Sequence, residues 1–356
     1  MKEWAISNGA SHWAHWFHPL TELTAEKHTA FVTADDNGFP LESFCGSDLM
    51  QSEPDASSFP SGGTRSTFEA RGYSAWDPTS PAFIIKSPKG GTLCIPSVFI
   101  AYDGTPLDLK TYLLRSTEAV ETRALKMLKL FGNRGVRYVR ATVGGEQEFF
   151  LLDRERARKR IDLRFCGRTL IGSPPPKDQK QEDHYFGTIP TRVLAYMEDV
   201  QRDLARLGVD LATRHNEASR CQFEFAPIFS EANKACDQNQ LTMEIMRKLA
   251  PQHNLRLLFH EKPFMGLNGS GKHVNFSLQD NEGRNLLKPS SNHRKNIIFL
   301  SFLTSFVYGV SEYSGLLQAS VSTSGNMHRL GGFEAPPAII SVYLGETVDK
   351  IINAIE

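Results

Sequence analysis

The chain has 356 residues, of which 40% are hydrophobic and 22% are charged, with 27 Gly and 19 Pro. This composition is typical of a folded globular protein and excludes a disordered, collagen-like or disulfide-stapled chain. Lys plus Arg and Asp plus Glu number 40 each, and the formal net charge of +0 argues against sequence-independent binding of nucleic acid, which requires a basic excess.

The N-terminal part of the chain is predicted to form a small β-rich unit. Residues 29–32 and a second run that ends at Phe44 flank Asn37-Gly38, a dipeptide that supplies the positive φ of tight hairpin turns. Residues 82–86 and 93–102 are further apolar runs typical of strands. A break at residues 103–106 leads us to expect one domain of residues 1–104 and a second of residues 105–356.

The remainder of the chain is predicted to alternate helices and strands. Apolar residues recur at intervals of three and four from Leu113 to Leu128 and from Val193 to Leu207, which indicates amphipathic helices. Residues 154–190 are charged and contain three consecutive prolines, so they form either a binding loop or a partly mobile insertion. Further helices are expected at 241–249 and 297–317, and strands at 136–153, with an interruption at Gly144-Gly145, 222–225 and 274–278.

Neither a disulfide framework nor an export signal is visible in the sequence. The most apolar stretch, residues 297–310, is interrupted by Ser301, Thr304 and Ser305 and is shorter than the ~20 residues of a membrane span. We therefore expect a buried helix there and no membrane partner. Widely spaced cysteines without a C-x-x-C pair favour reduced thiols in a cytoplasmic protein: Cys45, Cys94, Cys166, Cys221 and Cys236.

Two carboxylates alternate along the strand predicted at residues 136–153. Glu146 and Glu148 are two positions apart, so their side chains project from the same face of a strand, while Gln147 and Phe149 point the other way. Carboxylates that share a face beside apolar neighbours repel each other unless a cation lies between them. A solvated strand face is the alternative explanation.

Two further glutamates recur in strand-like segments. Glu217 follows His215 and Asn216, and Glu224 has a phenylalanine on each side. A charge between core-type residues favours a functional role, although a capped or salt-bridged glutamate also fits each segment taken alone.

Residues 266–272 match the phosphate-binding pattern G-x-x-x-x-G-K, but two physical requirements of such a loop are missing. The next residue is His273 where a Mg²⁺-binding hydroxyl is needed, and residues 274–278 read as a strand instead of the helix whose N-terminus receives the phosphate. The glycines instead allow the backbone to approach a ligand closely, while His273 either binds a ligand or is structural.

Several glutamates with one or two imidazoles and no thiolate suit hard cations such as Mg²⁺ or Mn²⁺ better than zinc. Two or more such ions suit phosphoryl transfer from ATP, in which charge neutralisation and positioning supply most of the catalysis. Arg329, five residues before Glu334 in a Gly- and Pro-rich loop, is suited either to bind a carboxylate bidentately or to form a loop salt bridge.

In this order, the segments resemble glutamine synthetase, and specifically its long type III form. The resemblance extends over nearly the whole chain and includes the Asn268-Gly269-Ser270-Gly271-Lys272-His273 loop. The other segments that carry it are Thr24-Ala25-Glu26-Lys27-His28, Glu53-Pro54-Asp55-Ala56-Ser57-Ser58-Phe59-Pro60, Phe68-Glu69-Ala70-Arg71-Gly72-Tyr73, Asp183-His184-Tyr185-Phe186-Gly187, Thr213-Arg214-His215-Asn216-Glu217 and Glu334-Ala335-Pro336-Pro337-Ala338-Ile339.

The resemblance implies an α+β protein with a β-grasp-like N-terminal domain and a catalytic α/β domain on an antiparallel sheet, here incomplete at its C-terminal end. The implied reaction is the ATP-dependent ligation of ammonia to L-glutamate through γ-glutamyl phosphate, which gives glutamine, ADP and phosphate. An analogue that acts on another amine is an alternative within the ligases. The resemblance also implies a homo-oligomer of stacked rings.

The resemblance also assigns metal ligands residue by residue. Glu148, Glu217 and Glu224 correspond to the ligands of the first metal, which holds the glutamate and ammonia side. Glu146 and His273 correspond to ligands of the second metal, which holds the ATP phosphates.

The substrate-binding and catalytic residues follow in the same way. Asn268 and Gly269 resemble the glutamate-binding loop, Arg329 the arginine that contacts the substrate carboxylate, and Asn275 and Ser277 are expected in the ATP site. The resemblance makes Glu334 the flap glutamate that shields the intermediate from water, and it assigns to Asp55 the deprotonation of ammonium across a subunit boundary, with Ala56 in place of the family's glycine.

Two departures from the family pattern affect these expectations. Residues 218–221 replace a Val-Ala-Pro run and place Arg220 near the first metal, and the sequence lacks the arginine-rich segment and the Glu-Phe-Arg strand that complete the nucleotide side, as well as an N-terminal extension. We favour a piece of an active ligase. The alternative is a catalytically silent truncated homologue that binds metal or glutamate or acts as an assembly partner.

Overall fold

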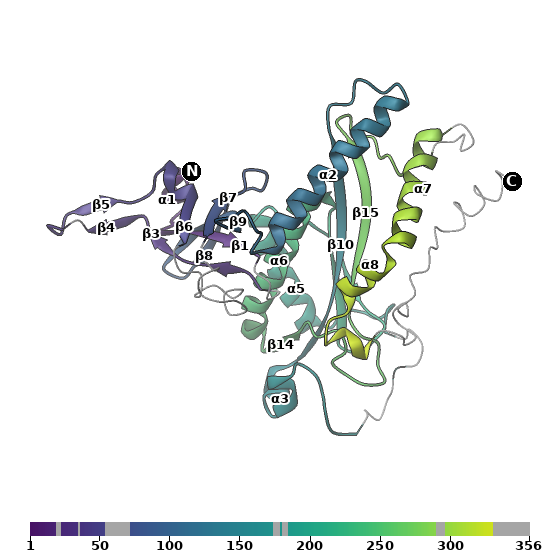
Figure 1. Ribbon diagram of the computed structural model, residues 1–356. Helices are drawn as coiled ribbons and strands as arrows, with labels where there is room; N and C mark the ends of the chain where they lie inside the picture. The colour runs from purple at the N-terminus through teal and green to yellow at the C-terminus, as the bar shows by residue number, and fades with distance from the viewer. Residues whose placement is uncertain are drawn as a thin grey trace. The chain divides into compact units, whose positions relative to one another are not determined.

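The computed structural model describes residues 1–18, 23–34, 36–53, 72–173, 179, 184–289 and 296–329 (Figure 1). The chain divides into two compact units. The first comprises Met1–Val120, Asp203–Val209 and Ser230–Glu244, and the second comprises Glu121–Arg202, Asp210–Phe229 and Ile245–Glu356. The chain therefore returns to the first unit twice after Val120.

The first unit contains a sheet with β1 (His12–Phe17) and β9 (Gly90–Ala101) side by side and parallel. Trp13, Trp16 and Phe17 of β1 are buried, which explains why this strand is almost entirely aromatic and apolar. The remaining pairings are antiparallel: β2 (Ala25–Glu26) and β3 (Thr29–Ala30) with β1, β7 (Gly72–Trp76) and β8 (Phe83–Ser87) with β9, and β6 (Met50–Glu53) with β7.

A hairpin around Gly38 is confirmed, but the run predicted as its first strand, residues 29–32, is divided, because residues 29–30 belong to β3 and pair with β1. The strands of the hairpin are β4 (Val32–Ala34) and β5 (Pro40–Glu42), which pair antiparallel, and Gly38 in the connection has φ +82. Only glycine adopts this backbone conformation at little cost, so the turn residue and the hairpin agree. Two short helical segments complete the N-terminal part, α1 (Lys2–Ser7) and the 3₁₀ helix η1 (Gly46–Leu49).

Four buried charged or titratable side chains meet inside the first unit, and we call them the Lys110 cluster: Lys110, Asp77, Asp237 and His18. Lys110, in the first turn of α2 (Leu109–Leu130), has its Nζ 3.1 Å from Asp77 Oδ2 and also contacts Asp237 of α6 (Ala232–Leu249). His18 Nε2 lies 2.9 Å from Asp237 Oδ1. Each buried carboxylate therefore has a cationic or imidazole partner.

The second unit is built on β10 (Val139–Asp153), a long strand with partners along most of its length. β12 (Gln222–Pro227), β14 (Leu255–Leu258) and β15 (Lys272–Asp280) each pair with it antiparallel, and β11 (Leu211–Asn216) pairs antiparallel with β12. The α+β class with an antiparallel second sheet is confirmed.

The predicted interruption at Gly144-Gly145 is wrong. Both glycines lie within β10, where Gly144 pairs with Asn275 and Gly145 with Val274. A Cβ atom on Gly144 would stand 3.3 Å from Phe229 Cβ, so this glycine permits a close side-chain approach and does not break the strand.

The predicted helices are present, and residues 154–190 contain structure that the sequence did not indicate. α5 (Thr191–Arg206) buries Val193, Met197 and Val200 on one face. Residues 154–190, predicted to be a loop or an insertion, begin with two short helices, α3 (Arg154–Arg158) and α4 (Ile161–Phe165). The other described elements are β13 (Ser230–Glu231), α7 (Ile297–Glu312), α8 (Ser314–Val321) and the 3₁₀ helices η4 (Ala250–His253) and η6 (Asn326–His328).

The most apolar stretch is helical, but its predicted burial is wrong. Within the described residues, Phe299 and Phe302 of α7 are buried, whereas Phe306 and Tyr308 are exposed. A helix that is apolar all round needs partners on every side, and the described part of the chain supplies them on one side only. No single described helix has the length and apolar character of a membrane span; α7 and α8 reach them only as a pair, with a bend of 71° between them.

Candidate active site

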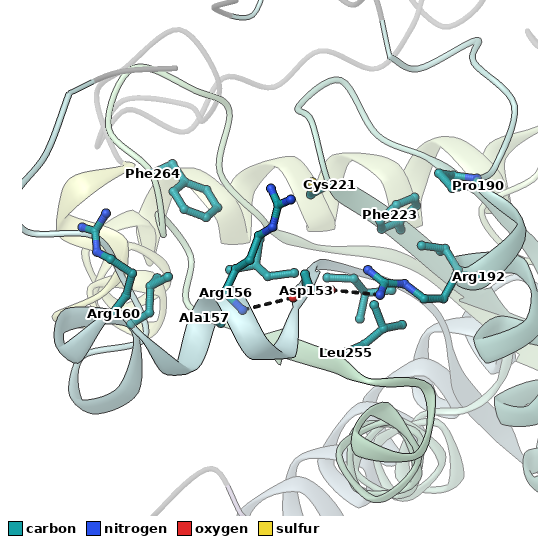
Figure 2. Close-up of a pocket in the computed structure, with 14 residues that line it drawn as sticks. Asp153, Arg156, Ala157, Arg160, Pro190, Arg192, Cys221, Phe223, Leu255 and Phe264 are labelled. Carbon is teal, nitrogen blue, oxygen red and sulfur yellow. Dashed lines mark hydrogen bonds and ion pairs between the residues drawn. The ribbon is translucent and has the colours of Figure 1, made fainter. Parts of the chain in front are cut away.

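A cavity of about 590 Å³ lies in the second unit beside α3 and the C-terminal end of β10 (Figure 2). Its charged lining is largely paired, because Arg192 Nη1 lies 3.0 Å from Asp153 Oδ2 and Arg160 donates to Asp162. Phe223 lines this cavity from β12, and its side chain points away from the strand face that carries Gln222 and Glu224. None of the predicted site residues that the structure describes lines this cavity.

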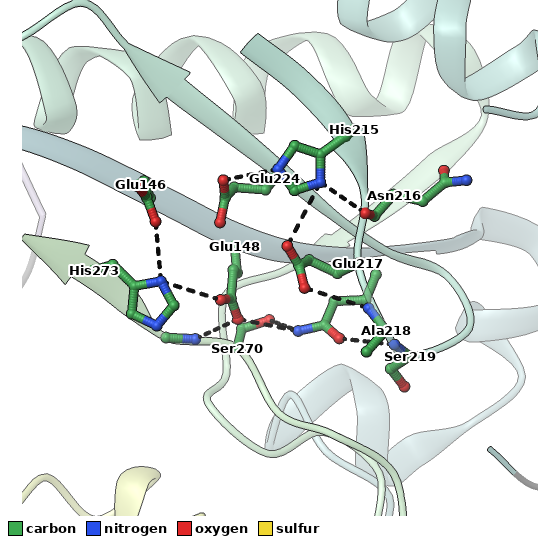
Figure 3. Close-up of polar contacts among 12 residues, drawn as sticks. Glu146, Glu148, His215, Asn216, Glu217, Ala218, Ser219, Glu224, Ser270 and His273 are labelled. Carbon is green, nitrogen blue, oxygen red and sulfur yellow. Dashed lines mark hydrogen bonds and ion pairs between the residues drawn. The ribbon is translucent and has the colours of Figure 1, made fainter. Parts of the chain in front are cut away.

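Strand register gathers the predicted acidic residues elsewhere in the same unit (Figure 3). Antiparallel pairing sets Glu224 of β12 opposite both Glu148 of β10 and His215 of β11. Glu146 of β10 is opposite His273 of β15. Residues that pair directly across strands lie on the same face of a sheet, so these side chains form one row across four strands.

His273 lies beside both glutamates of β10. Its Nδ1 is 3.0 Å from Glu146 Oε2 and 3.9 Å from Glu148 Oε1. Asn275, two residues further along β15, donates from Nδ2 to Glu146 Oε1 at 2.9 Å. His273 and Asn275 are exposed whereas Glu148 is buried, so the row runs from solvent into the interior.

Gln222 is a central residue of the candidate site, although its sequence context did not indicate a role there. Its buried amide nitrogen donates to the carbonyl of Gly269 at 2.8 Å and to Glu148 Oε2 at 3.2 Å. The same Glu148 oxygen accepts the backbone N–H of Gly271 at 2.8 Å. The available signal was the two-residue spacing between Gln222 and Glu224, which places both on one face of β12.

His215 also belongs to the row, although it was not predicted as a site residue. Its Nε2 lies 3.0 Å from Glu224 Oε1 and its Nδ1 lies 3.6 Å from Glu217 Oε1. Burial by itself lowers the pKa of His215, but its hydrogen bond to the carbonyl of Asn216 and the two carboxylates raise that pKa above its usual range. The signal was again a spacing, His215 being two residues before Glu217.

Glu148 and Glu224 of the row are buried, and the half-buried Glu217 lies beside them. Burial, together with the charges of Glu148 and Glu224, raises the pKa of Glu217 to about 7, and burial also raises the pKa values of Glu148 and Glu224. Among the described residues, no Lys or Arg forms an ion pair with these three. Two sets of ligand atoms lie within 4.8 Å of one another, Glu146 with Glu224 and His273, and His215 with Glu217 and Glu224. This donor set fits a bound divalent cation.

Arg329 lies against the predicted glutamate-binding loop. A Cβ atom on Gly271 would stand 2.8 Å from its Nη2, and one on Gly269 would stand 3.2 Å from its Cδ and 2.1 Å from the carbonyl oxygen of Glu261. These approaches explain why both loop positions are glycine. Arg329 Nε is buried without a partner in the described part of the chain, and its charge favours an anionic ligand.

The remaining predicted residues are placed as follows. Asn268 is hydrogen-bonded to Gln179, and Ser277 donates to Asn285 Oδ1 at 2.6 Å on the same face of β15 as Asn275. Arg220, expected to add a positive charge near the first metal, makes no ion pair with Glu217. The predicted catalytic residues Asp55 and Glu334 lie outside the described residues.

Family models and relatives agree with the resemblance. The model of the glutamine synthetase type III N-terminal region matches residues 1–116, and that of the glutamine synthetase catalytic domain matches residues 121–340. The type-3 glutamine synthetase of Dictyostelium discoideum is 51% identical over 357 residues, which cover 100% of this chain and 48% of that relative. A glutamine synthetase of Bacteroides fragilis is 48% identical over 359 residues and is covered to 49%. The chain thus spans about half the length of these relatives.

Solved structures show the same fold. A cryo-electron microscopy structure of Plasmodium falciparum glutamine synthetase matches with a TM-score of 0.64 and 21% identity, covering 91% of this chain and 61% of that chain. A structure of GmaS in complex with ADP matches with a TM-score of 0.64 and 18% identity, covering 93% and 67%. With the catalytic-domain model matched over most of the chain, the protein belongs to the glutamine synthetase family, in its type III form.

Proposed function

We propose that the protein ligates ammonia to L-glutamate with ATP, through γ-glutamyl phosphate, and releases glutamine, ADP and phosphate. The observation that carries the proposal is a group of three carboxylates, Glu148, Glu217 and Glu224, that form no ion pair with Lys or Arg among the described residues and lie next to a glycine loop against which Arg329 packs. The names of two relatives, both glutamine synthetases, support the same reaction.

We assign Glu148, Glu217 and Glu224 to a first divalent cation and Glu146 and His273 to a second. Carboxylate oxygens with one imidazole and no thiolate suit Mg²⁺ or Mn²⁺. Glu224 belongs to both sets of close ligand atoms, which supports two ions that lie near each other. When bound, such ions neutralise the negative charge of the nucleotide phosphates and of the transferred phosphoryl group.

The chain's own polar groups are assigned to the substrates. Arg329 binds a carboxylate of glutamate through its guanidinium, and Asn268 and Gly269 supply hydrogen-bonding groups beside it. Asn275 and Ser277 extend from the same face of β15 as His273 and are assigned to ATP.

Asp55 and Glu334 keep the roles that the resemblance implies. A carboxylate at Asp55 takes a proton from ammonium, which is otherwise not nucleophilic. A flap that carries Glu334 keeps water away from γ-glutamyl phosphate, which water would hydrolyse.

We further propose a homo-oligomer of stacked rings in the cytoplasm. The assignment of Asp55 to a site across a subunit boundary requires a neighbouring copy. None of the five cysteines forms a disulfide within the described part of the chain, in keeping with a reducing compartment.

The test is to measure Mn²⁺ binding by calorimetry and ATP-dependent glutamine formation in the full-length protein, before and after Glu217→Ala. The proposal expects the wild type to form glutamine and the variant to lose both Mn²⁺ affinity and turnover. Glu155→Ala, which removes an exposed glutamate of α3, is the matched control and should change neither. Normal turnover in Glu217→Ala would refute the ligand assignment, and a wild type without glutamine formation would refute the ligase.

A further inference from the structure

The loop of residues 268–271 is fixed by hydrogen bonds from several elements of the second unit. The backbone N–H of Ser270 donates to the carbonyl of Glu261 at 2.8 Å, and that of Gly271 donates to Glu148 Oε2 at 2.8 Å. Gln222 holds the carbonyl of Gly269. These bonds occupy backbone groups of the loop, so the side chain of Asn268 is an important remaining polar group that the loop can offer to a ligand.

Gln179 pairs with Asn268 through two hydrogen bonds that close a ring. The backbone N–H of Asn268 donates to Gln179 Oε1 at 2.9 Å, and Gln179 Nε2 donates to Asn268 Oδ1 at 2.9 Å. Both residues are partly buried at this contact, which limits competition from water.

This ring determines which way both amides point. A backbone N–H can only donate, so the Gln179 atom that faces it must be the oxygen, and the other Gln179 atom must be the nitrogen. Since that nitrogen also only donates, the Asn268 atom opposite it must be Oδ1. The remaining amide nitrogen of Asn268 therefore carries two N–H donors, and it has no hydrogen-bond partner in the described part of the chain.

We propose that Gln179 is a positioning residue that fixes Asn268 with its N–H donors toward the substrate, so that this part of the site selects a carboxylate. The inference rests on the proposed function, because it assigns the carboxylate to L-glutamate. Arg329 lies against the same loop and also carries only donors, so both side chains match a group that only accepts hydrogen bonds. Gln179 acts through Asn268 and needs no contact with the substrate.

Two substitutions of Gln179 should differ in their effect on glutamate binding. Gln179→Glu keeps an oxygen for the backbone N–H of Asn268 but replaces the donor with a second oxygen. Asn268 must then turn its amide over to donate to that oxygen, and its carbonyl would face the substrate carboxylate. Gln179→Ala removes both hydrogen bonds and leaves the Asn268 amide free to rotate. Gln179→Glu, which reverses the Asn268 amide, should therefore weaken glutamate binding more than Gln179→Ala, which only removes the two hydrogen bonds.

The experiment measures L-glutamate binding by calorimetry in the full-length protein with Mg²⁺, together with the KM values for glutamate and ATP. We expect Gln179→Glu to weaken glutamate binding by about tenfold and Gln179→Ala by less, with the KM for ATP and the melting temperature unchanged. Gln252→Glu, at an exposed position in η4, makes the same change of charge and should leave glutamate binding unchanged. In an Asn268→Ala background, the two substitutions at Gln179 should become equivalent, because the group they orient is gone.

Each outcome decides between the inference and the proposed function. Equal glutamate affinity in Gln179→Glu and wild type would overturn the positioning role, even if the protein makes glutamine. A loss that persists undiminished in the Asn268→Ala background would also overturn it, because Gln179 would then act by another route. Glutamate binding that depends on Gln179 without any glutamine formation would sustain the positioning role and reject the ligase. A wild type that binds no glutamate would reject both.

Discussion

The two units contain buried carboxylates in opposite electrostatic situations. In the Lys110 cluster of the first unit, burial by itself raises the pKa of Asp77, but hydrogen bonds from Thr79 and Asn233 and the charge of Lys110 bring that pKa below its usual range. Asp237, which contacts Lys110 and His18, also has a lowered pKa despite its burial. Among the glutamates of the second unit, the effect of burial exceeds that of the hydrogen bonds and positive charges, so the pKa values of Glu148, Glu217 and Glu224 are raised.

This difference distinguishes a structural cluster from a candidate binding site. The fold already provides the positive charge that Asp77 and Asp237 need, so removal of that charge should destabilise the protein. The glutamate row has imidazole neighbours in His215 and His273 but no Lys or Arg ion pair among the described residues, so the fold is stable there only at a cost that a bound cation would offset. Four predictions test this contrast, beginning with the largest expected effect.

Lys110→Met should lower the free energy of unfolding by about 3–5 kcal/mol, because it leaves Asp77 and Asp237 buried without their cation. Urea denaturation of the full-length protein measures the loss. Lys2→Met is the matched control: it breaks the Lys2–Glu42 ion pair at the surface and should cost about 0–1 kcal/mol. If the two substitutions cost the same, the charges of the Lys110 cluster are not balanced by Lys110.

Glu217→Gln should change the free energy of unfolding in the opposite direction to Lys110→Met. In metal-free protein near neutral pH it replaces a partly charged group that the fold disfavours, so we expect a gain of roughly 1–2 kcal/mol in the free energy of unfolding. The same variant should lose Mn²⁺ affinity in calorimetry, because an amide oxygen is a weaker ligand than a carboxylate. A loss of stability in the absence of metal would show that the negative charge of Glu217 is compensated after all.

The individual acidic residues could be selected from the sequence because their type and spacing are local properties. The two-residue spacing of Glu146 and Glu148 predicts a shared strand face, and β10 has that face. The contacts across strands could not be predicted in the same way, because register depends on which strands pair. The missed residues His215 and Gln222 are identified as site residues only by that register.

The errors in the predicted fold have a similar cause. Gly144 and Gly145 are read as a break when each residue is considered alone, but pairing with β15 on one edge keeps both in the strand. β1 and β14 were not predicted, since a strand such as β1, which is buried along nearly its whole length, shows no alternation of apolar and polar residues that distinguishes it from a buried helix. Periodicity was sufficient for α5, whose apolar face repeats over four turns.

Gln222→Met should weaken Mn²⁺ binding by about tenfold, a typical effect of removing a residue that orients a metal ligand. Methionine has a similar size but cannot donate to Glu148 or to the carbonyl of Gly269. Gln252→Met, at an exposed position in η4, is the control for loss of a glutamine amide. Unchanged Mn²⁺ affinity would mean that the backbone N–H of Gly271 is sufficient to orient Glu148.

The pH dependence of metal stabilisation should be the smallest of these effects and should follow from Glu217. Its pKa of about 7 in the fold lies above the ordinary carboxyl value of 4.5, so the folded protein holds this proton more tightly than the unfolded chain does. That contribution to stability is complete below the unfolded value and is lost as the pH rises through about 7.

A divalent cation competes with the same proton, so the rise in melting temperature on addition of Mg²⁺ should be a few degrees larger at about pH 8 than at about pH 5.5. In Glu217→Gln this difference should shrink, because the competing proton is gone. A Mg²⁺ effect that is equal at both pH values would mean that the ion binds away from Glu217. The contrast between the two units would then reflect buried charge alone and would not identify a metal site.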